Sequence, residues 1–581
     1  MATLPPQKTV GREPIMLVQI DQDFCENVYG EAPCTADGIT KCFNTRKTCQ
    51  DPENFIKGVL TLNFCKPLLN LPIDLPVIPS LRSGSTVATE INPQNGNLNS
   101  SPLGKRATAT LTFQDHPHSD FLVDPYVDER PYNPFESSTF WAKWLARNPY
   151  YHNRPIRIFD GYIGQPLNEM RVRHYLIDSI TVPDSRGTVR ITAKDPLKLV
   201  EKEQAQIPRA STGRLSAPIT TIVATTFSVD RALITDYDAS GYVRIGNEII
   251  EYASITQNGS LLTFNNCTRG VFGSTASTHD TNAAVQKTIY YQDQTLWTGI
   301  RSLLVDFCGI SPQFIDDDEW EAENDQFLAQ FNFTSVLSVP ASVFSVLNQL
   351  TQQLPFYIYW NERTNYIEYK ATRYYSGEFP LLTETEIIAD SFSTSTNPKD
   401  RISQVWVYHT PLDWTKTTTV NFKQLELNAD LELEGPNFYD EQKIRIIESF
   451  WLSGAQAVNL TGRLLRFNSE TPLYVRLSVD AKDGQLWVGD VVDIEHRSVV
   501  DEFGQKLVNR YLVFAATEGI NGTTFDYQLI KVVSTVIITG FYLDFDAPLY
   551  ENATEQQKEN GAWYADEFGQ LPVFVEGYQY E

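Results

Sequence analysis

The chain has 581 residues, which is too long for one hydrophobic core and indicates roughly three to five domains. Its 47 Lys and Arg against 72 Asp and Glu give a formal net charge of −25. A surface this acidic repels phosphate backbones and anionic lipids, which argues against a general nucleic-acid or membrane-surface binder. No stretch approaches the roughly 18–20 apolar residues of a membrane span, and the N-terminus lacks the apolar core of a secretory signal. We therefore expect the chain to fold in a reducing cytoplasm.

Four of the seven cysteines lie close together near the start of the chain. They are Cys25, Cys34, Cys42 and Cys49, separated by eight, seven and six residues. In a reducing compartment such a group favours metal binding over disulfides. Zinc sites often use cysteines two residues apart, whereas wide loops bent at Gly30, Pro33 and Gly38 suit a larger group such as a [4Fe–4S] cluster. Zinc and a pair of disulfides remain as alternatives.

Short strands dominate the chain after the cysteines. A weakly alternating stretch predicts a strand at Phe55–Asn63, and closely spaced prolines from Pro67 onward predict an extended linker. Four further stretches are β-branched, alternating and bounded by turn residues, which is typical of strands. These predicted strands are Ala107–Phe113, Arg154–Ile163, His174–Val182 and Gly187–Ala193.

One aromatic-rich segment, 124–151, interrupts these strands. It contains a predicted helix at Ser138–Arg147, which Ser137 or Ser138 would cap and Pro149 would end. The density of aromatic side chains indicates a surface that packs on its own domain or on a neighbouring subunit.

A composition rich in Thr, Ser, Ala and Gly marks 208–288 as a small inserted all-β module. Its clearest signal is a β-hairpin at Gly241–Ser254 that turns at Gly246. A strand at Leu261–Phe264 and the loop Cys267–His279 follow. The cysteine, histidine and glycines of this loop could serve a phosphate or a metal. A turn-rich hairpin is favoured because no lysine follows the glycines and a strand, not a long helix, comes next.

Helices appear in the second half of the chain. A 3.6-residue apolar period predicts one at Leu296–Phe307, and a second candidate, Val343–Gln353, precedes two short predicted strands. Beyond Arg401 the chain is again rich in predicted strands, with one helix near Gly454–Phe467. The last segment, 532–581, is acidic and aromatic, and we expect it to lie along another surface.

No catalytic motif stands out. The sequence contains no H-E-x-x-H, no G-x-S-x-G, no Walker loop and no dinucleotide-binding glycine pattern. His116 and His118 could form a metal pair, but an exposed turn is favoured. The acidic run Asp316–Glu319 suits a solvated loop better than a cation site. We therefore expect the protein not to be an enzyme.

The cysteine pattern resembles a known family. C-x8-C followed by C-x6-C, with Tyr29-Gly30 in the first loop and Arg46-Lys47 in the last, is similar to the cysteine-rich domain of lambdoid phage tail-tip attachment proteins. Four such cysteines hold a [4Fe–4S] cluster there, which implies the same iron ligands here. They would be Cys25, Cys34, Cys42 and Cys49, with Cys65 close enough in sequence to replace one of them. In the lambdoid pattern this domain is C-terminal and its middle gap is longer.

The rest of the chain resembles the baseplate or tail hub of long-tailed phages and related gene-transfer particles. Three passages carry the resemblance: TFWAKWLARNPYYHNRPIRIFDGYIG (Thr139–Gly164), IDSITVPDSRGTVRITAKDPLKL (Ile177–Leu199) and IGNEIIEYASI…CTRGVFGSTASTH (Ile245–His279). Hub proteins of this type form a trimeric ring of β-barrel-like domains under the tail tube. The resemblance therefore implies a homotrimer with two such domains in each chain.

These inferences together predict a mainly β, multidomain protein with hub β-barrel-like domains. The parts are a Cys-rich iron–sulfur domain (1–70), a first hub β domain (72–207) with the excursion 124–151, the inserted all-β module (208–288), an α/β hub segment (289–395), a second hub β domain (396–531) and a C-terminal extension (532–581) that packs on a partner or neighbouring subunit.

The implied function is that of a structural virion protein, a tail-tip hub that closes the tail tube and opens for genome ejection. Its expected partners are two further copies of itself, the tail tube or distal tail protein, the central fibre, other tail-tip proteins and the tape measure protein. DNA would meet it only in passage, and no stable membrane insertion is expected. It would be assembled in the host cytoplasm and reside in the virion. The alternatives are a tail-associated hydrolase acting on cell wall or surface glycan, and an iron–sulfur redox protein.

Overall fold

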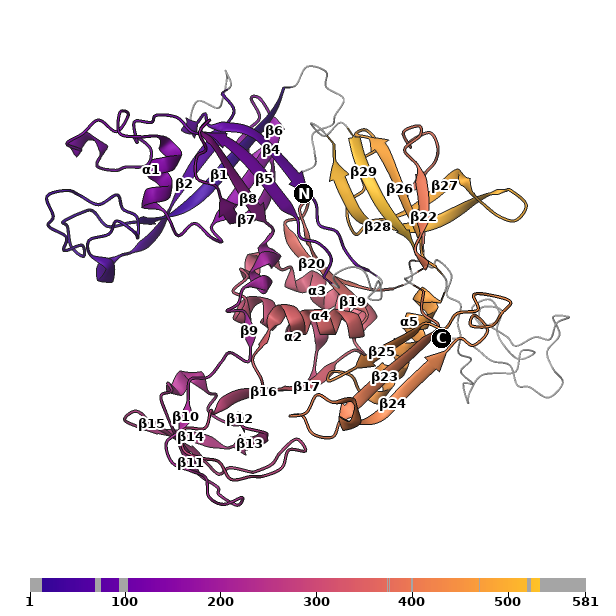
Figure 1. Ribbon diagram of the computed structural model, residues 1–581. Helices are drawn as coiled ribbons and strands as arrows, with labels where there is room; N and C mark the ends of the chain where they lie inside the picture. Colours follow the sequence, from indigo (N-terminus) through magenta and orange to yellow (C-terminus); the bar gives the residue numbers. More distant parts are fainter. Residues whose placement is uncertain are drawn as a thin grey trace, which may run out of the picture. The chain divides into compact units, whose positions relative to one another are not determined.

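The computed structural model describes residues 13–67, 75–93, 103–373, 375, 377–398, 401–469, 471–519 and 524–532 (Figure 1). The chain divides into two units, and nearly all described residues belong to the unit formed by Met1–Arg373 and Phe379–Lys531. This unit is mainly β, with several sheets and a few helices, as the sequence predicts. The predicted C-terminal extension lies, apart from Val532, outside the described residues.

An eight-stranded sheet comes first, in the order β3-β2-β1-β6-β7-β8-β5-β4. Its strands are β1 (Pro14–Cys25), β2 (Lys57–Cys65), β3 (Val77–Ile78), β4 (Leu81–Val87), β5 (Thr108–Gln114), β6 (Pro155–Tyr162), β7 (Arg171–Ile180) and β8 (Thr188–Lys194). Neighbouring strands are antiparallel except β2 and β3. Alternation explains β5, where Ala109, Leu111 and Phe113 are buried while the threonines between them are half-buried. The predicted strands β5 to β8 are confirmed.

The long strand β1 was not predicted. It pairs with β2 on one side and with β6 on the other, so it lies inside the sheet. Asp21 on β1 is held by Arg157 of β6, with oxygen–nitrogen distances of 2.7 and 2.9 Å. Such acidic positions mask the apolar alternation of β1 until its cross-strand partner is known. The predicted boundary between 1–70 and 72–207 therefore falls within one hydrogen-bonded sheet.

Helix α1 (Phe140–Arg147) packs on this sheet. Trp141 is fully buried, and its ring stacks on Phe64 of β2 with a centroid distance of 5.2 Å. The helix ends before Pro149 as predicted, but its N-cap is Thr139 and not Ser137 or Ser138. Ser138 has a positive φ of 81°, so it belongs to the turn that leads into the helix.

The inserted module contains two small sheets with a core of their own. Their strands are β10 (Arg214–Leu215), β11 (Phe227–Asp230), β14 (Ser254–Asn258) and β15 (Leu261–Asn265) in one sheet, and β12 (Gly241–Ile245), β13 (Glu248–Tyr252), β16 (Gln286–Gln294) and β17 (Phe333–Leu337) in the other. The predicted hairpin is confirmed, because Ile245 pairs with Glu248 across a turn in which Gly246 has a φ of 59°.

The middle of the chain forms the α/β segment. Its elements are α2 (Leu296–Ser302), which continues as a π-helical turn (Leu303–Phe307), α3 (Asp317–Glu323) with a second π-helical turn (Asn324–Leu328), α4 (Val343–Gln353), the pair β19 (Phe356–Asn361) and β20 (Tyr366–Ala371), and the short pair β9 (Gln206–Ile207) and β18 (Ala341–Ser342). Both predicted helices are present. In the described part of the chain, no helix is both long and apolar enough to cross a bilayer.

The acidic run Asp316–Glu319 is the start of α3 and not the solvated loop that was favoured. Asp316 caps the helix by accepting a hydrogen bond from the Glu319 N–H, at 3.2 Å. Asp317 forms an ion pair with Arg301 of α2 at 2.6 Å. Carboxylates at a helix N-terminus are stabilised by the helix dipole, which explains why so acidic a run is helical.

Two sheets complete the chain. One is three-stranded, in the order β24-β23-β25, and the other is six-stranded, in the order β21-β27-β28-β29-β26-β22. Their elements are β21 (Leu381–Leu382), β22 (Ser393–Thr396), β23 (Gln404–Pro411), β24 (Phe422–Ala429), β25 (Ile444–Glu448), α5 (Gly454–Asn468), β26 (Leu473–Asp480), β27 (Val491–Val500), β28 (Lys506–Glu518) and β29 (Thr524–Lys531). Helix α5 contacts β23 and β24. Short 3-10 helices lie at Pro52–Asn54, Val127–Glu129, Leu167–Glu169, Pro196–Glu201, Ile234–Asp236, Pro312–Phe314 and Thr419–Asn421.

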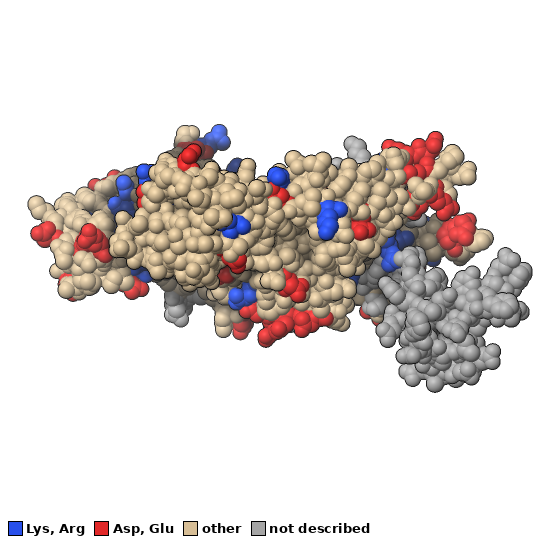
Figure 2. Space-filling model, turned by 90° about the horizontal axis from the view of Figure 1, so that it is seen from below, with Lys and Arg blue, Asp and Glu red and all other residues tan. Residues whose placement is uncertain are grey.

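The eight-stranded and six-stranded sheets meet directly. The Ile91 N–H donates to the Phe514 carbonyl at 2.8 Å, next to a β-bridge between Glu90 and Ala515. Arg171 of β7 pairs with Glu518 of β28 at 2.8 Å. Strands far apart in sequence are therefore joined by main-chain and ionic contacts. On the face drawn in Figure 2, charged side chains stand in small separate groups among uncharged ones.

Candidate functional site

The four clustered cysteines lie on one loop of the eight-stranded sheet. Cys25 is the last residue of β1 and pairs with Lys57, the first residue of β2, so the other three lie in the connection between these strands. This connection has one short 3-10 helix and no strand. All four are free thiols. Cys25 and Cys42 are buried, while Cys34 and Cys49 are half-buried.

Cys65 is separated from this group. It lies at the far end of β2, where it pairs with Leu17 and not with the residues next to Cys25. Eight residues of strand separate it from Lys57, a length of roughly 26 Å. Burial raises the pKa of the Cys65 thiol to about 11. The expectation that Cys65 could replace one of the four ligands is therefore wrong in this arrangement, because sequence proximity runs along an extended strand.

The four thiols act on one another electrostatically. Burial raises the pKa of Cys42, and the negative charges that Cys49, Cys34 and Cys25 would carry raise it further, while a hydrogen bond with Asn44 opposes them. Burial also raises the pKa of Cys49, with Cys25 and Cys34 adding to it. Repulsion of this kind requires sulfur atoms that lie near each other. The loop thus gathers four thiols in one region.

The donor set suits a thiolate-bound metal, but the side chains are not closed around one. Among the described residues, no three His, Cys, Asp or Glu side chains are arranged to hold a metal ion. Four sulfur donors from a single loop nevertheless fit an iron–sulfur cluster or zinc, both of which bind thiolates. Rotation of these side chains toward a common centre would be needed for binding.

Asn44 fixes the cysteine loop to the end of β1. It has a φ of 50°, and its carbonyl accepts from the Cys25 N–H at 2.7 Å. Its side-chain amide donates to the carbonyls of Cys25 and Asn27 at 3.0 and 3.2 Å. The Cys42 thiol lies 3.5 Å from its side-chain oxygen. One asparagine therefore ties two of the four cysteines together.

A second set of bonds holds the outer part of the loop. The Tyr29 hydroxyl donates to Gln50 at 2.5 Å, and the Gln50 amide donates to the Thr40 carbonyl at 2.8 Å. Gly38 lies against these side chains, since a Cβ there would stand 2.5 Å from the Gln50 oxygen. Asp51 accepts from the Thr35 N–H at 2.7 Å. Side chains thus replace the main-chain ladder that this loop lacks.

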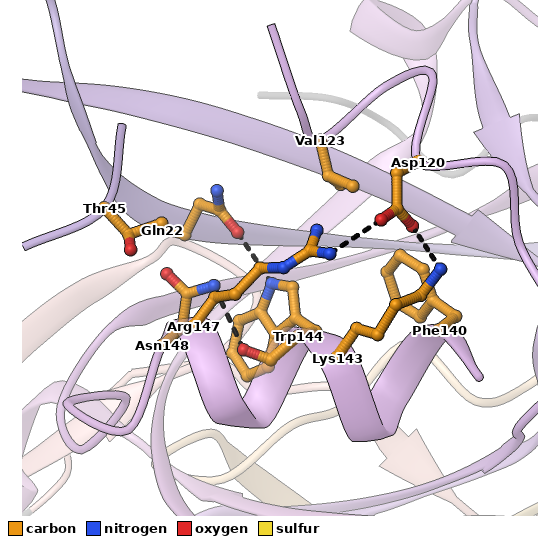
Figure 3. A pocket seen from close by; sticks show the side chains of 9 residues that line it. All are labelled: Gln22, Thr45, Asp120, Val123, Phe140, Lys143, Trp144, Arg147 and Asn148. Atoms are coloured by element: carbon orange, nitrogen blue, oxygen red, sulfur yellow. Dashed lines mark hydrogen bonds and ion pairs between the residues drawn. The ribbon is translucent and has the colours of Figure 1, made fainter. Parts of the chain in front are cut away.

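A small cavity lies beside the loop and is lined by Thr45, Gln22 and residues of α1 (Figure 3). Its volume of about 10 Å³ has room for one water molecule at most. In Figure 3, Asp120 faces Arg147 and Lys143, which lie 2.8 and 2.7 Å from it. The cavity is therefore the edge of a buried ion cluster and not a substrate pocket.

Asp120 stays ionised in this cluster. Burial acts to raise its pKa, but hydrogen bonds with His118, Lys143 and Arg147 outweigh burial and lower the pKa to about 2. The His118 ring nitrogen accepts from the Asp120 N–H at 2.9 Å, and His116 lies 3.3 Å from the Gln114 carbonyl. The two histidines are thus engaged in a turn, the reading that was favoured over a metal pair.

A buried carboxylate organises the loop Cys267–His279 of the module. Glu248 is fully buried, and both of its oxygens lie 2.6 Å from the Arg269 guanidinium. His279 Nε2 lies 2.7 Å away, and the Ser277 N–H donates at 3.0 Å. Burial acts to raise the pKa of Glu248, but the hydrogen bonds with His279 and Arg269 lower it to about 2. The predicted turn-rich loop is thus wrapped around an ion pair. Sequence reasoning had missed the role of Glu248.

Comparisons with known proteins place few constraints on the chain. No protein-family model matches it, and no curated protein matches it. Three solved structures show a remote likeness. They are the prophage tail protein gp18 from Listeria monocytogenes EGD-e (8% identity over 90% of this chain and 96% of that chain, TM-score 0.34), the 43 kDa tail protein of prophage MuSo2 from Shewanella oneidensis (9%, 78% and 93%, 0.35) and a tail protein from Neisseria meningitidis MC58 (10%, 77% and 91%, 0.36). Values this low assign neither a fold nor a function.

Proposed function

We propose that this protein is a structural component of a phage tail, a baseplate or tail-tip hub that closes the tail tube and opens for DNA passage. The observation that carries the proposal is the joining of two antiparallel sheets from opposite ends of the chain through Ile91–Phe514 and Arg171–Glu518. Hub proteins, by the sequence resemblance, use two β-barrel-like domains of this kind. The ranges 72–207 and 396–531 for these domains stay predictions.

The electrostatics favour a structural role over catalysis. Buried carboxylates such as Asp120, Glu248 and Asp160 are each held by arginine. Burial raises the pKa of Asp160, but the charges of Arg173 and Arg171 overcome this and lower it. Groups fixed in this way are poor proton donors near neutral pH. We infer that the protein is not a hydrolase.

A test of the hub is a density map of the assembled tail tip. The expected result is three copies of this chain in a ring below the tail tube, in contact with the distal tail protein, the central fibre and other tip proteins. Two results would refute the proposal. One is absence of the chain from purified virions, and the other is clearing of purified cell wall by the isolated chain, which would favour the hydrolase.

For the cysteine loop we propose a [4Fe–4S] cluster on Cys25, Cys34, Cys42 and Cys49. Such a cluster would tie together four points of a loop without strands, and its binding free energy would add to folding stability. The support is the donor set, the mutual effect of the four thiols on Cys42 and the sequence resemblance. We assign it a structural role, because no other group in the proposal needs an electron.

Metal analysis of anaerobically purified protein tests this cluster. We expect a brown protein with about four iron and four sulfide ions per chain. Cys34→Ser should lower the iron content and the yield of folded protein. Cys308→Ser is the matched control, since Cys308 is a buried core thiol in another part of the chain. Stoichiometric zinc without iron, or a metal-free wild-type protein, would exclude the cluster.

The three-stranded sheet supports the proposed homotrimer. Facing pairs in its register, Trp406 with Leu427 and Tyr408 with Leu425, share one face. Ile446 of β25 lies opposite Trp406 on that same face. Leu427 is 52% exposed and Ile446 is 57% exposed, whereas Val405, Val407 and Ile447 are buried on the other face toward α5. Apolar patches of this kind commonly mark protein interfaces.

A further inference from the structure

The side chain of Arg130 joins the cysteine loop to the segment 120–148. Its guanidinium is nearly buried, with 2% of the side chain exposed, and it makes a two-pronged contact with fully buried Asp124 at 2.7 and 2.8 Å. Its remaining N–H groups point to the loop. One donates to the Lys41 carbonyl at 2.6 Å and another to the Cys42 carbonyl at 2.9 Å. The main chain on both sides of the Lys41–Cys42 peptide is therefore held by one side chain.

Phe43 lies between two guanidinium groups. The Arg130 guanidinium carbon is 3.9 Å from the centre of the Phe43 ring, and that of Arg147 is 4.0 Å from it. Arg147 is in turn bound to Asp120 at 2.8 Å. Contacts of this type are strongest where water is excluded. The residue that follows Cys42 is thus clamped by two cations that are anchored in their own ion pairs.

The charge of Arg130 also reaches the thiols. Burial acts to lower the pKa of Arg130, but Asp124 outweighs burial and the pKa is raised, with the Cys42 thiol contributing to the increase. Four thiolates around a cluster carry excess negative charge. Partners outside the ligand shell that fix ligands and offset their charge are part of how proteins hold metals.

We propose that Arg130 is a positioning residue of the thiolate site, which fixes Cys42 through the two carbonyls and offsets the negative charge of the bound group. This inference rests on the proposed cluster. Lysine cannot replace arginine fully, because its ammonium keeps the charge but cannot reach Asp124 and two carbonyls in one planar fork. Arg130→Met removes both effects, whereas Arg130→Lys removes only the geometric one.

The experiment compares cluster retention and reduction potential in three purified full-length proteins. In Arg130→Met we expect chelator-driven loss of iron to be about tenfold faster than in the wild type, the lower end of the effect of such outer partners. We also expect a lower midpoint potential, since a nearby positive charge favours the more negative reduced cluster. Arg130→Lys should restore the potential more than the retention.

Arg510→Met is the matched control. Arg510 makes the same two-pronged contact, with Asp493 at 2.8 and 2.9 Å, and lies 4.4 Å from the Phe379 ring, but it is on β28 of the other large sheet. It should leave iron retention and potential unchanged. If Arg130→Met is insoluble, the Arg130→Lys protein decides through its faster iron loss.

The outcomes separate the two proposals. A wild-type protein without iron would refute the cluster and, with it, this role of Arg130. A wild-type protein with the cluster, together with an Arg130→Met protein of unchanged retention and potential, would refute the role of Arg130 alone. Equal losses in Arg130→Met and Arg510→Met would show general destabilisation and would also overturn the assignment.

Discussion

Single buried charges determine local structure at several points of this protein, and Glu248 is the clearest case. Its carboxylate holds Arg269 and His279 and receives a main-chain N–H, so one residue of β13 fixes a loop of the module. The folded-state pKa of about 2 lies below the ordinary value of 4.5. The carboxylate therefore contributes stability that is present above pH 4.5 and is lost as the pH falls toward 2.

We predict that Glu248→Gln lowers the free energy of unfolding of the module by about 3 kcal/mol, because it leaves Arg269 as a buried charge without its carboxylate. Hydrogen exchange of the β12 and β13 amides measures this locally. The variant should also lose the dependence of module stability on pH between 4.5 and 2. Glu251→Gln, at a half-buried position on the same strand, is the control. Unchanged exchange in Glu248→Gln would contradict the prediction.

At the scale of elements, α1 connects the eight-stranded sheet with the cysteine loop. Trp141 packs on Phe64 and on Phe113, whose ring centre is 4.9 Å away. The Trp144 N–H donates to Gln22 of β1 at 2.6 Å, and the last residue of the helix, Arg147, covers Phe43 of the loop. The helix is therefore anchored on the apolar face of the sheet and carries a cation to the loop.

Trp141→Ala should lower the free energy of unfolding by roughly 3–5 kcal/mol, the cost of emptying a buried aromatic site. Chemical denaturation followed by circular dichroism measures the change. Tyr150→Ala, at a residue that is 59% exposed just after the helix, should change stability by less than about 0.5 kcal/mol. A loss below about 1 kcal/mol in Trp141→Ala would mean that α1 is not a core element of this sheet.

At the scale of the whole molecule, the exposed apolar face of the three-stranded sheet is the feature that a single chain does not explain. Helix α5 contacts the sheet from its other face, while Leu425, Leu427 and Ile446 remain exposed. The proposed trimer provides an occupant for this face, namely another copy of the chain. Self-association should then depend on these residues.

We predict that Leu427→Glu combined with Ile446→Glu converts the trimer to a monomer, because two charges would have to be buried in the interface. Light scattering of the full chain measures the mass. Val223→Glu, at a module residue that is 76% exposed, is the control and should leave the mass unchanged. A double variant that remains trimeric would place the interface elsewhere.

Local features of this protein were determined by the sequence alone. The alternation of β5, the 3.6-residue period of α4 and the turn at Gly246 depend on side chains a few residues apart, so they are readable without any partner. The concentration of four cysteines in one loop is equally local. These features carried the predictions that were confirmed.

Tertiary structure decided the rest, because it depends on pairing between distant segments. Strand β1 became recognisable only with β2 and β6 on either side, and the same register places Cys65 far from Cys25. The contact of Arg130 with the Cys42 carbonyl spans 88 residues. No periodicity encodes such a contact, since it arises from where two loops are brought together by one sheet.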